Sequence, residues 1–418
     1  MDRRATIRWL HQPSLSDRAT WIDSQYTDPP QFTVVPGQVA SGTEVSFTGA
    51  GGTVYFTTDG SDPRLPGGNV SPSASTSAAV DVPSTTIITA RARSGSGLTS
   101  WSSALRGTYL VGPIASASDL VISELHYAPA QPSPAEQATS VDAADYEWIE
   151  FANLGAQTID LTDVHFEAGV EFTFTGSTIT TLARGERVLI VSNQAAFVAR
   201  YGNGFDARIG GEFGPSRLDN AGERIHLVDA LGGTIQDFTY NDRHPWPTEA
   251  GSTGYSLVLI TDGATPPDHS LPSNWRSSAL LGGNPDADDS DPLAGDPIAD
   301  DDEDGLRRLL EYALGTSDSD PTHGNDSFSA AIEAVTINDL KQDHLVITFQ
   351  RDLAADDVDL SVEISRDCTI WMGGHGSVEF VSQINQGDGS AIVKYRSTQA
   401  FAPATASRAF MRLVAELR

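Results

Sequence analysis

The stretch DYEWIEFANLGAQTIDLTDVHF, residues 145–166, decides the fold class of this chain. Near its start, Ile149 and Phe151 alternate with Trp148 and Glu150. A period of two residues is typical of a β-strand that turns one face to a core and the other to solvent. We therefore predict a half-buried strand here, which the Asn-Leu-Gly turn in the middle of the stretch connects to the next strand.

Short runs of the same kind extend in both directions. Residues 31–111 and 119–260 contain β-type runs broken by Gly, Ser and Pro, and strands return after residue 328. Between residues 119 and 260 only AAFVARYG, residues 195–202, has a helical pattern. These patterns predict an all-β fold of tandem β-sandwich modules.

A chain of 418 residues is expected to contain about three domains. The composition places the predicted boundaries as follows: 1–28, a helical piece that cannot fold alone; 29–112, a β-sandwich; 113–286, a second β-sandwich; 287–325, an acidic linker with one helix; and 326–418, a C-terminal β-sandwich.

The composition argues against two classes of partner. The chain has 26 Lys and Arg against 56 Asp and Glu, a net charge of −30. Nucleic-acid-binding proteins gain most of their affinity from basic side chains, and anionic membrane surfaces attract basic segments. Lys341 and Lys394 are the only lysines. We therefore predict no nucleic-acid partner. No run approaches the ~20 apolar residues of a membrane span, so we predict no membrane insertion either.

The single cysteine, Cys368, excludes an internal disulfide. No CxxC-type motif surrounds it, so we interpret it as a small buried apolar residue and not as a reactive thiol.

Residues 286–304 contain ten carboxylates and no basic residue. We interpret this segment as a self-repelling linker. It is followed directly by GLRRLLEYALG, residues 305–315, in which leucines and an alanine recur at helical spacing. This pattern predicts a helix of about three turns that stops at Gly315.

The junction of linker and helix contains the clearest chemical motif, D-x-D-x-D-G-x₅-E. This spacing places oxygen ligands around Ca²⁺, and the glycine, Gly305, permits a sharp bend. The predicted ligands are the side chains of Asp300, Asp302, Asp304 and Glu311 and the carbonyl oxygen of Leu306.

Two residues depart from the calcium pattern. Arg307 stands where an apolar residue usually packs, and Arg308 stands where a short oxygen side chain or a water is usual. The alternative is an acidic segment that only caps a helix N-terminus, where the helix dipole favours negative charge. Both interpretations stay open from the sequence.

Catalytic motifs of the common hydrolase and nucleotide-binding types are not found. The nine histidines are scattered, and we interpret each as structural. Glu147 and Glu150 lie three apart on a predicted strand and so face opposite sides. We therefore predict no enzymatic activity. Five tryptophans offer either sugar-stacking platforms or, as we favour, packing positions: Trp101, Trp148, Trp246, Trp275 and Trp371.

Several segments resemble known modules. TVYFTTDGSDPR (53–64) with TTIITARA (85–92) is similar to the chitobiase C-terminal-like, fibronectin-III-associated module. Residues 120–285 resemble the bacterial lamin-tail domain through LVISELHYAP, the stretch quoted at the start, GERVLIVSN, LDNAGERIHLVDALGGTIQDFTY, NWRSS and GGNP, which implies an immunoglobulin-like sandwich. Residues 300–320 resemble the calcium-loop-plus-helix linker of large bacterial surface proteins, and the tail resembles the small β module that often follows it.

The order of these modules resembles the C-terminal half of secreted proteins that begin with a CotH-like kinase domain. This resemblance implies that residues 1–28 are the last helix of such a domain and that Met1 is not the true start, which would explain the missing signal peptide. No kinase motif is present, so no kinase activity is implied.

We predict a non-enzymatic extracellular or cell-surface scaffold or adhesion protein with a calcium-stabilised linker. Its expected partner is a cell-surface or extracellular matrix component, with polysaccharide as one candidate. The alternative is a carbohydrate-binding accessory region of a polysaccharide-active enzyme. The sequence does not fix the oligomeric state.

Overall fold

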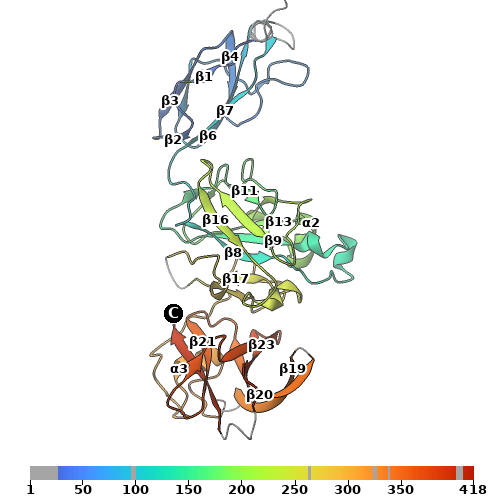
Figure 1. Ribbon diagram of the computed structural model, residues 1–418. Helices are drawn as coiled ribbons and strands as arrows, with labels where there is room; N and C mark the ends of the chain where they lie inside the picture. Colours follow the sequence, from blue (N-terminus) through green and yellow to red (C-terminus); the bar gives the residue numbers. More distant parts are fainter. Residues whose placement is uncertain (1–26, 96–99, 262–264, 323–326, 338, 402–407) are drawn as a thin grey trace, which may run out of the picture. The chain divides into compact units, whose positions relative to one another are not determined.

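The computed structural model describes residues 27–95, 100–261, 265–322, 327–337, 339–401 and 408–418. The chain divides into two compact units, 1–114 and 115–418 (Figure 1). The helix predicted within residues 1–28 lies outside the described residues, apart from residues 27 and 28. No described helix is long and apolar enough to cross a membrane.

The first unit is a β-sandwich of two sheets with strand orders β1-β3-β5 and β2-β7-β6-β4. Its strands are β1 (Gln31–Phe32), β2 (Gly37–Gln38), β3 (Thr43–Thr48), β4 (Thr53–Thr57), β5 (Ala79–Val82), β6 (Thr86–Arg93) and β7 (Leu105–Leu110). Both sheets contribute to one core, in which Val45 and Val82 meet Phe56, Ile88 and Tyr109.

The second unit contains two sandwiches. The first has a six-stranded sheet of order β14-β13-β9-β8-β17-β18, which packs on a three-stranded sheet of order β11-β15-β16, and a short pair, β10-β12. Its strands are β8 (Leu120–His126), β9 (Trp148–Asn153), β10 (Ile159–Asp160), β11 (His165–Ala168), β12 (Thr181–Leu182), β13 (Arg187–Val191), β14 (Ile209–Glu212), β15 (Arg224–Val228), β16 (Thr234–Thr239), β17 (Leu257–Leu259) and β18 (Trp275–Ser277).

Short helices connect these strands. They are the α-helix α2 (Gln194–Tyr201), which overlaps the predicted helix at 195–202, and the 3-10 helices η2 (Glu136–Ala138), η3 (Ala143–Tyr146), η4 (Asn203–Arg208), η5 (Thr248–Gly251) and η6 (Pro272–Asn274). The Asn193 side chain caps α2 by accepting a hydrogen bond from the Ala196 amide.

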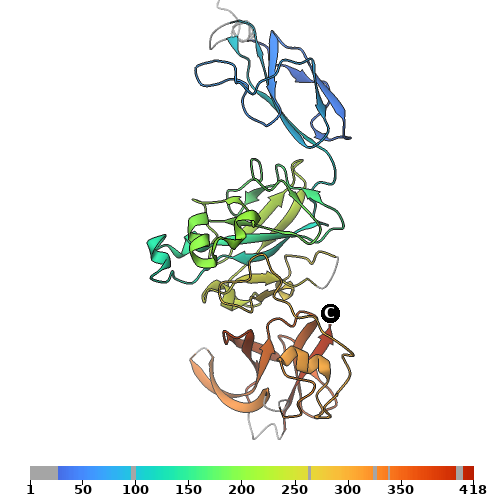
Figure 2. The ribbon, with the colours of Figure 1, turned by 180° about the vertical axis from the view of Figure 1, so that it is seen from behind.

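The prediction that one face of β9 meets solvent is wrong. Every residue of β9 is buried. Ile149 and Phe151 point into the main core, whereas Trp148 on the opposite face packs against Phe197 and Tyr201 of α2. Because β9 is an inner strand of a sheet that α2 covers from outside (Figure 2), both of its faces are enclosed.

The second sandwich of this unit has sheets of order β19-β20-β24-β23 and β22-β21-β25. Its strands are β19 (Phe328–Ile337), β20 (Leu340–Asp352), β21 (Val358–Ser365), β22 (Met372–Gly373), β23 (Val378–Asn385), β24 (Ser390–Ser397) and β25 (Phe410–Leu417). On the first sheet, the Lys394 ammonium pairs with Glu333 at 3.2 Å.

The helix α3 (Arg308–Leu314) belongs to this last sandwich. It packs against β20, β21 and β25, and Leu314 lies in a core with Ile347 and Phe349. Gly315 ends it in the left-handed conformation (φ 70°), as predicted. With seven residues, α3 has two turns and not the predicted three, because residues 305–307 belong to the loop in front of it.

The acidic segment 286–304 is not simply self-repelling. The Asp289 side chain is 8 % exposed and accepts from the Arg276 guanidinium of β18 at 2.6 Å. The same guanidinium contacts Asp356, next to β21, at 2.6 Å. An arginine from the first sandwich thus neutralises one carboxylate of the segment and one of the second sandwich.

The interpretation of Cys368 as a buried residue is also wrong. The cysteine is exposed and free, and its φ of 59° places it in a left-handed turn after β21. The Ser365 hydroxyl and the Asp367 carboxylate organise this turn by accepting from backbone amides. A cysteine in such a surface turn cannot reach the core.

Candidate metal centre

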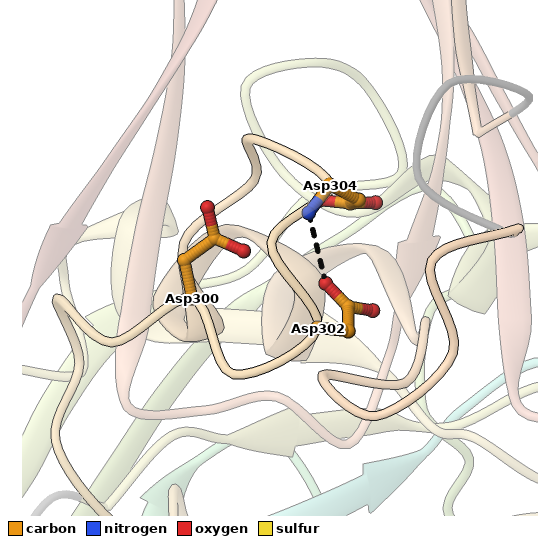
Figure 3. A group of neighbouring side chains, drawn as sticks. All are labelled: Asp300, Asp302 and Asp304. Atoms are coloured by element: carbon orange, nitrogen blue, oxygen red, sulfur yellow. Dashed lines mark hydrogen bonds between the residues drawn. The ribbon is translucent and has the colours of Figure 1, made fainter.

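The loop in front of α3 gathers three of the predicted ligands. One carboxylate oxygen each from Asp300, Asp302 and Asp304 lies within 4.8 Å of the others (Figure 3). The loop is shaped by its own amides: Asp304 donates to Asp302 Oδ1 at 3.2 Å, and Gly305 donates to Asp300 Oδ2 at 3.2 Å. Gly305 has a φ of 93°, which favours glycine. The D-x-D-x-D-G spacing therefore folds the chain into a ring of carboxylates.

Glu311 approaches this ring from α3. Its side chain is almost completely buried, with 1 % of the residue exposed. The Thr316 hydroxyl lies 3.4 Å from its Oε1, but Oε2 is buried without a hydrogen-bond partner. One oxygen each of Asp300 and Asp302 is in the same condition. A buried carboxylate oxygen without a hydrogen-bond donor lowers the stability of the fold unless a cation or a proton neutralises it.

Electrostatics at Glu311 point the same way. Burial raises the pKa of Glu311 to about 7, and the neighbouring carboxyl groups of Asp318, Asp302 and Asp304 add to the rise. Ca²⁺ prefers a set of oxygen ligands that includes several carboxylates. The donor set present here fits that ion better than a softer transition metal, because no histidine or cysteine belongs to it.

Leu306 was predicted to contribute its carbonyl oxygen. It follows Gly305 directly, and its amide donates to Asp304 Oδ1 at 2.7 Å. This bond fixes the backbone at the loop position from which a carbonyl ligand is expected.

The two arginines that depart from the motif do not block the loop. Arg307 is exposed and forms the N-cap position of α3. Arg308 directs its guanidinium to the carboxylates of Asp301 and Asp318. Its Nε lies 2.7 Å from Asp318 Oδ2. The positive charge of Arg308, at the ninth loop position, is therefore paired with the carboxylates of Asp301 and Asp318.

Asp318 is the residue that motif reasoning missed. It lies seven residues beyond the motif, in the run SDSDP after Gly315, where the sequence offers only a cluster of turn-forming residues. The sharp reversal at Gly315 is the signal that could have indicated its return toward the loop.

The five tryptophans do not form a stacking surface. Trp101, Trp148, Trp246 and Trp275 are buried. Trp371 is partly buried, and the Arg412 guanidinium covers its ring at 4.4 Å. The packing interpretation of these residues is confirmed for the four buried ones.

Glu147 and Glu150 have different partners. Glu147 accepts from the Leu218 amide at 2.9 Å. Glu150 accepts from the Ser123 hydroxyl at 2.7 Å and from Arg187 Nε at 3.0 Å. Glu150 is the register partner of Glu124 across strands β8 and β9. Sequence spacing alone could not indicate this pair.

The comparison with known families concerns the middle of the chain. Residues 113–242 match the Lamin Tail Domain family model. These residues cover most strands of the first sandwich of the second unit, and the lamin tail domain is an immunoglobulin-like β-sandwich. No curated protein and no solved structure matches the chain.

Proposed function

We propose that this chain is a non-enzymatic extracellular or cell-surface scaffold built from β-sandwich modules, one of them a lamin tail domain, and that calcium stabilises its C-terminal module. The observation that carries the calcium part is the ring of Asp300, Asp302 and Asp304 with the orphaned oxygen of Glu311. The extracellular setting agrees with it, because millimolar Ca²⁺ saturates even weak loops.

The position of α3 gives the proposed cation a structural effect. The helix that contributes Glu311 also places Leu314 in the core of the C-terminal sandwich. Its Tyr312 hydroxyl donates to the Asp291 carbonyl oxygen at 2.6 Å. A cation that neutralises Glu311 would therefore stabilise the sandwich itself together with the acidic segment.

Thermal unfolding tests this proposal. Calcium at 100 times its dissociation constant would stabilise the module that binds it by about 2.7 kcal/mol. We expect millimolar CaCl₂ to raise the unfolding temperature of one calorimetric transition relative to the chelated protein. The double variant Asp302→Asn, Glu311→Gln should lose this calcium-dependent rise.

Glu303→Gln is the matched control, because Glu303 is exposed and stands in the same loop outside the ring. It should keep the full calcium effect. Equal melting with calcium and with chelator in the unmodified chain would refute the calcium part of the proposal.

A further inference from the structure

A cavity of about 240 Å³ lies within the second unit, between residues of its two sandwiches. Trp246 and Trp275 line it from the first sandwich, and Phe380 and Tyr395 line it from the second. Asp359 also lines the cavity, and because its side chain is 61 % exposed, the cavity is open to solvent there. Aromatic walls with a few polar groups are typical of a small-molecule site.

The polar group that distinguishes this cavity is the guanidinium of Arg351, near the end of β20. Arg351 follows the core residue Phe349 by two positions, so it lies on the core-facing side of the strand. Its Nε is buried without a hydrogen-bond partner, and among the described residues its guanidinium forms no ion pair. Burial lowers the pKa of Arg351, and the charge of Asp356 offsets only part of this effect. The side chain is therefore a half-buried cation without a bound anion.

The two other arginines of the cavity wall already have carboxylate partners. Arg276 contacts both Asp289 and Asp356, and Arg418 pairs with Asp359 at 2.7 Å. These carboxylates are engaged, so the remaining guanidinium can gain a direct partner from a ligand. Their negative charges also repel a dianion such as phosphate more strongly than a carboxylate, which carries a single charge.

Taking the extracellular scaffold proposed above as its setting, we propose that this cavity binds a terminal uronic acid residue of an acidic saccharide, with the carboxylate on Arg351. The planar guanidinium can hold a carboxylate through two parallel hydrogen bonds. The cavity is smaller than the roughly 300–1,000 Å³ that drug-sized ligands occupy, so it admits one ring. The aromatic walls suit the C–H face of that ring, and the hydroxyl groups of Thr248 and Ser273 suit its hydroxyl groups.

Saturation-transfer NMR on the full chain tests this proposal. We expect sodium D-glucuronate to bind with a dissociation constant in the millimolar range, because a ligand of one ring buries few atoms. D-Glucose, which has the same ring without the carboxylate, should bind about tenfold more weakly or not at all. The buffer is free of calcium, so that no carboxylate is captured by a cation at the loop in front of α3.

Variants of the arginine locate the binding. Arg351→Gln should weaken glucuronate binding about tenfold or more, because the charge-assisted pair is lost. Arg351→Lys keeps the charge without the planar fork and should retain only part of the affinity. Arg366→Gln is the matched control, because it makes the same change of charge at an exposed arginine outside the cavity wall. It should leave binding unchanged.

Far-UV circular dichroism and calorimetry without ligand establish that each variant folds. Arg351→Gln removes a cation that has no ion-pair partner, so it should not lower the unfolding temperature. Arg351→Lys, which keeps the charge, provides a second folded variant.

The outcomes separate this proposal from the calcium-stabilised scaffold. Absence of glucuronate binding, equal binding of glucose or phosphate, or tighter binding of benzoate would overturn the assignment to an acidic sugar. Glucuronate binding that Arg351→Gln leaves unchanged would overturn the assignment to this cavity. Each of these results leaves the calcium-dependent unfolding as it is, and a failure of that unfolding test leaves the glucuronate result as it is.

Discussion

Glu147 illustrates how a single buried carboxyl group couples the fold to pH. It precedes β9, and its carboxyl group accepts a hydrogen bond from the Leu218 amide. Burial raises its pKa to about 8, and the hydrogen bond from Leu218 and the charge of Arg217 offset only part of this rise. The group is therefore protonated in the folded protein at neutral pH.

A pH series on Glu147→Gln tests this assignment. The folded pKa of about 8 lies above the ordinary 4.5, so the stabilisation from the protonated group is complete below pH ~4.5 and is lost as pH rises toward 8. Each unit of difference is worth about 1.4 kcal/mol. Urea unfolding at pH 5 and pH 8 should show a smaller loss of stability in the variant than in the unmodified chain. The exposed Glu171→Gln serves as control, and equal losses in all three proteins would contradict the assignment.

At the scale of elements, α3 joins the proposed calcium loop to a hydrophobic core. Its spacing of leucines predicted the helix and its end at Gly315. The sequence could not indicate which sheet the helix packs against, because that depends on β20 and β21, more than 25 residues further along. Asp318 was missed for a different reason, because it lies beyond the motif and returns to the loop through the reversal at Gly315. The ring of Asp300, Asp302 and Asp304 followed from local spacing.

Leu314→Ala tests the packing of α3. Leu314 is fully buried in the core that contains Ile347 and Phe349, and truncation of such a leucine costs about 2–5 kcal/mol of stability. In calorimetry, we expect a lower unfolding temperature for the transition that responds to calcium. Ile298→Ala removes apolar atoms from a side chain that is 66 % exposed and should leave this transition unchanged. A similar effect of both substitutions would show that α3 is not a core element.

At the scale of the second unit, the composition did not predict the ion pairs that connect its two sandwiches. The ten carboxylates of residues 286–304 predicted a self-repelling linker, and the alternation of apolar residues predicted separate sandwiches. Neither pattern shows that Arg276, on β18, binds Asp289 and Asp356 at once. Likewise, the alternation around Ile149 correctly indicated a strand but not the burial of both its faces, because α2 covers the sheet from a different part of the chain.

Arg276→Ala should make the two sandwiches of this unit unfold at different temperatures. The arginine side chain is 3 % exposed, and its loss leaves two buried carboxylates without compensation, at a cost of about 3–5 kcal/mol. We expect an additional or broadened calorimetric transition and faster proteolysis within residues 278–300. Adding Asp289→Asn and Asp356→Asn should restore part of the stability. Arg412→Ala, which breaks a more exposed pair with Glu363, should do neither.

The positions of the two lysines, Lys341 and Lys394, have a practical consequence. Lys394 lies on β24, and Lys341 lies on the neighbouring β20. Apart from the terminal amine, amine-reactive reagents therefore meet this protein on one sheet of its C-terminal sandwich. Coupling through lysine would tether the molecule by that sheet and leave the side chains of residues 113–242, which match the Lamin Tail Domain model, unmodified.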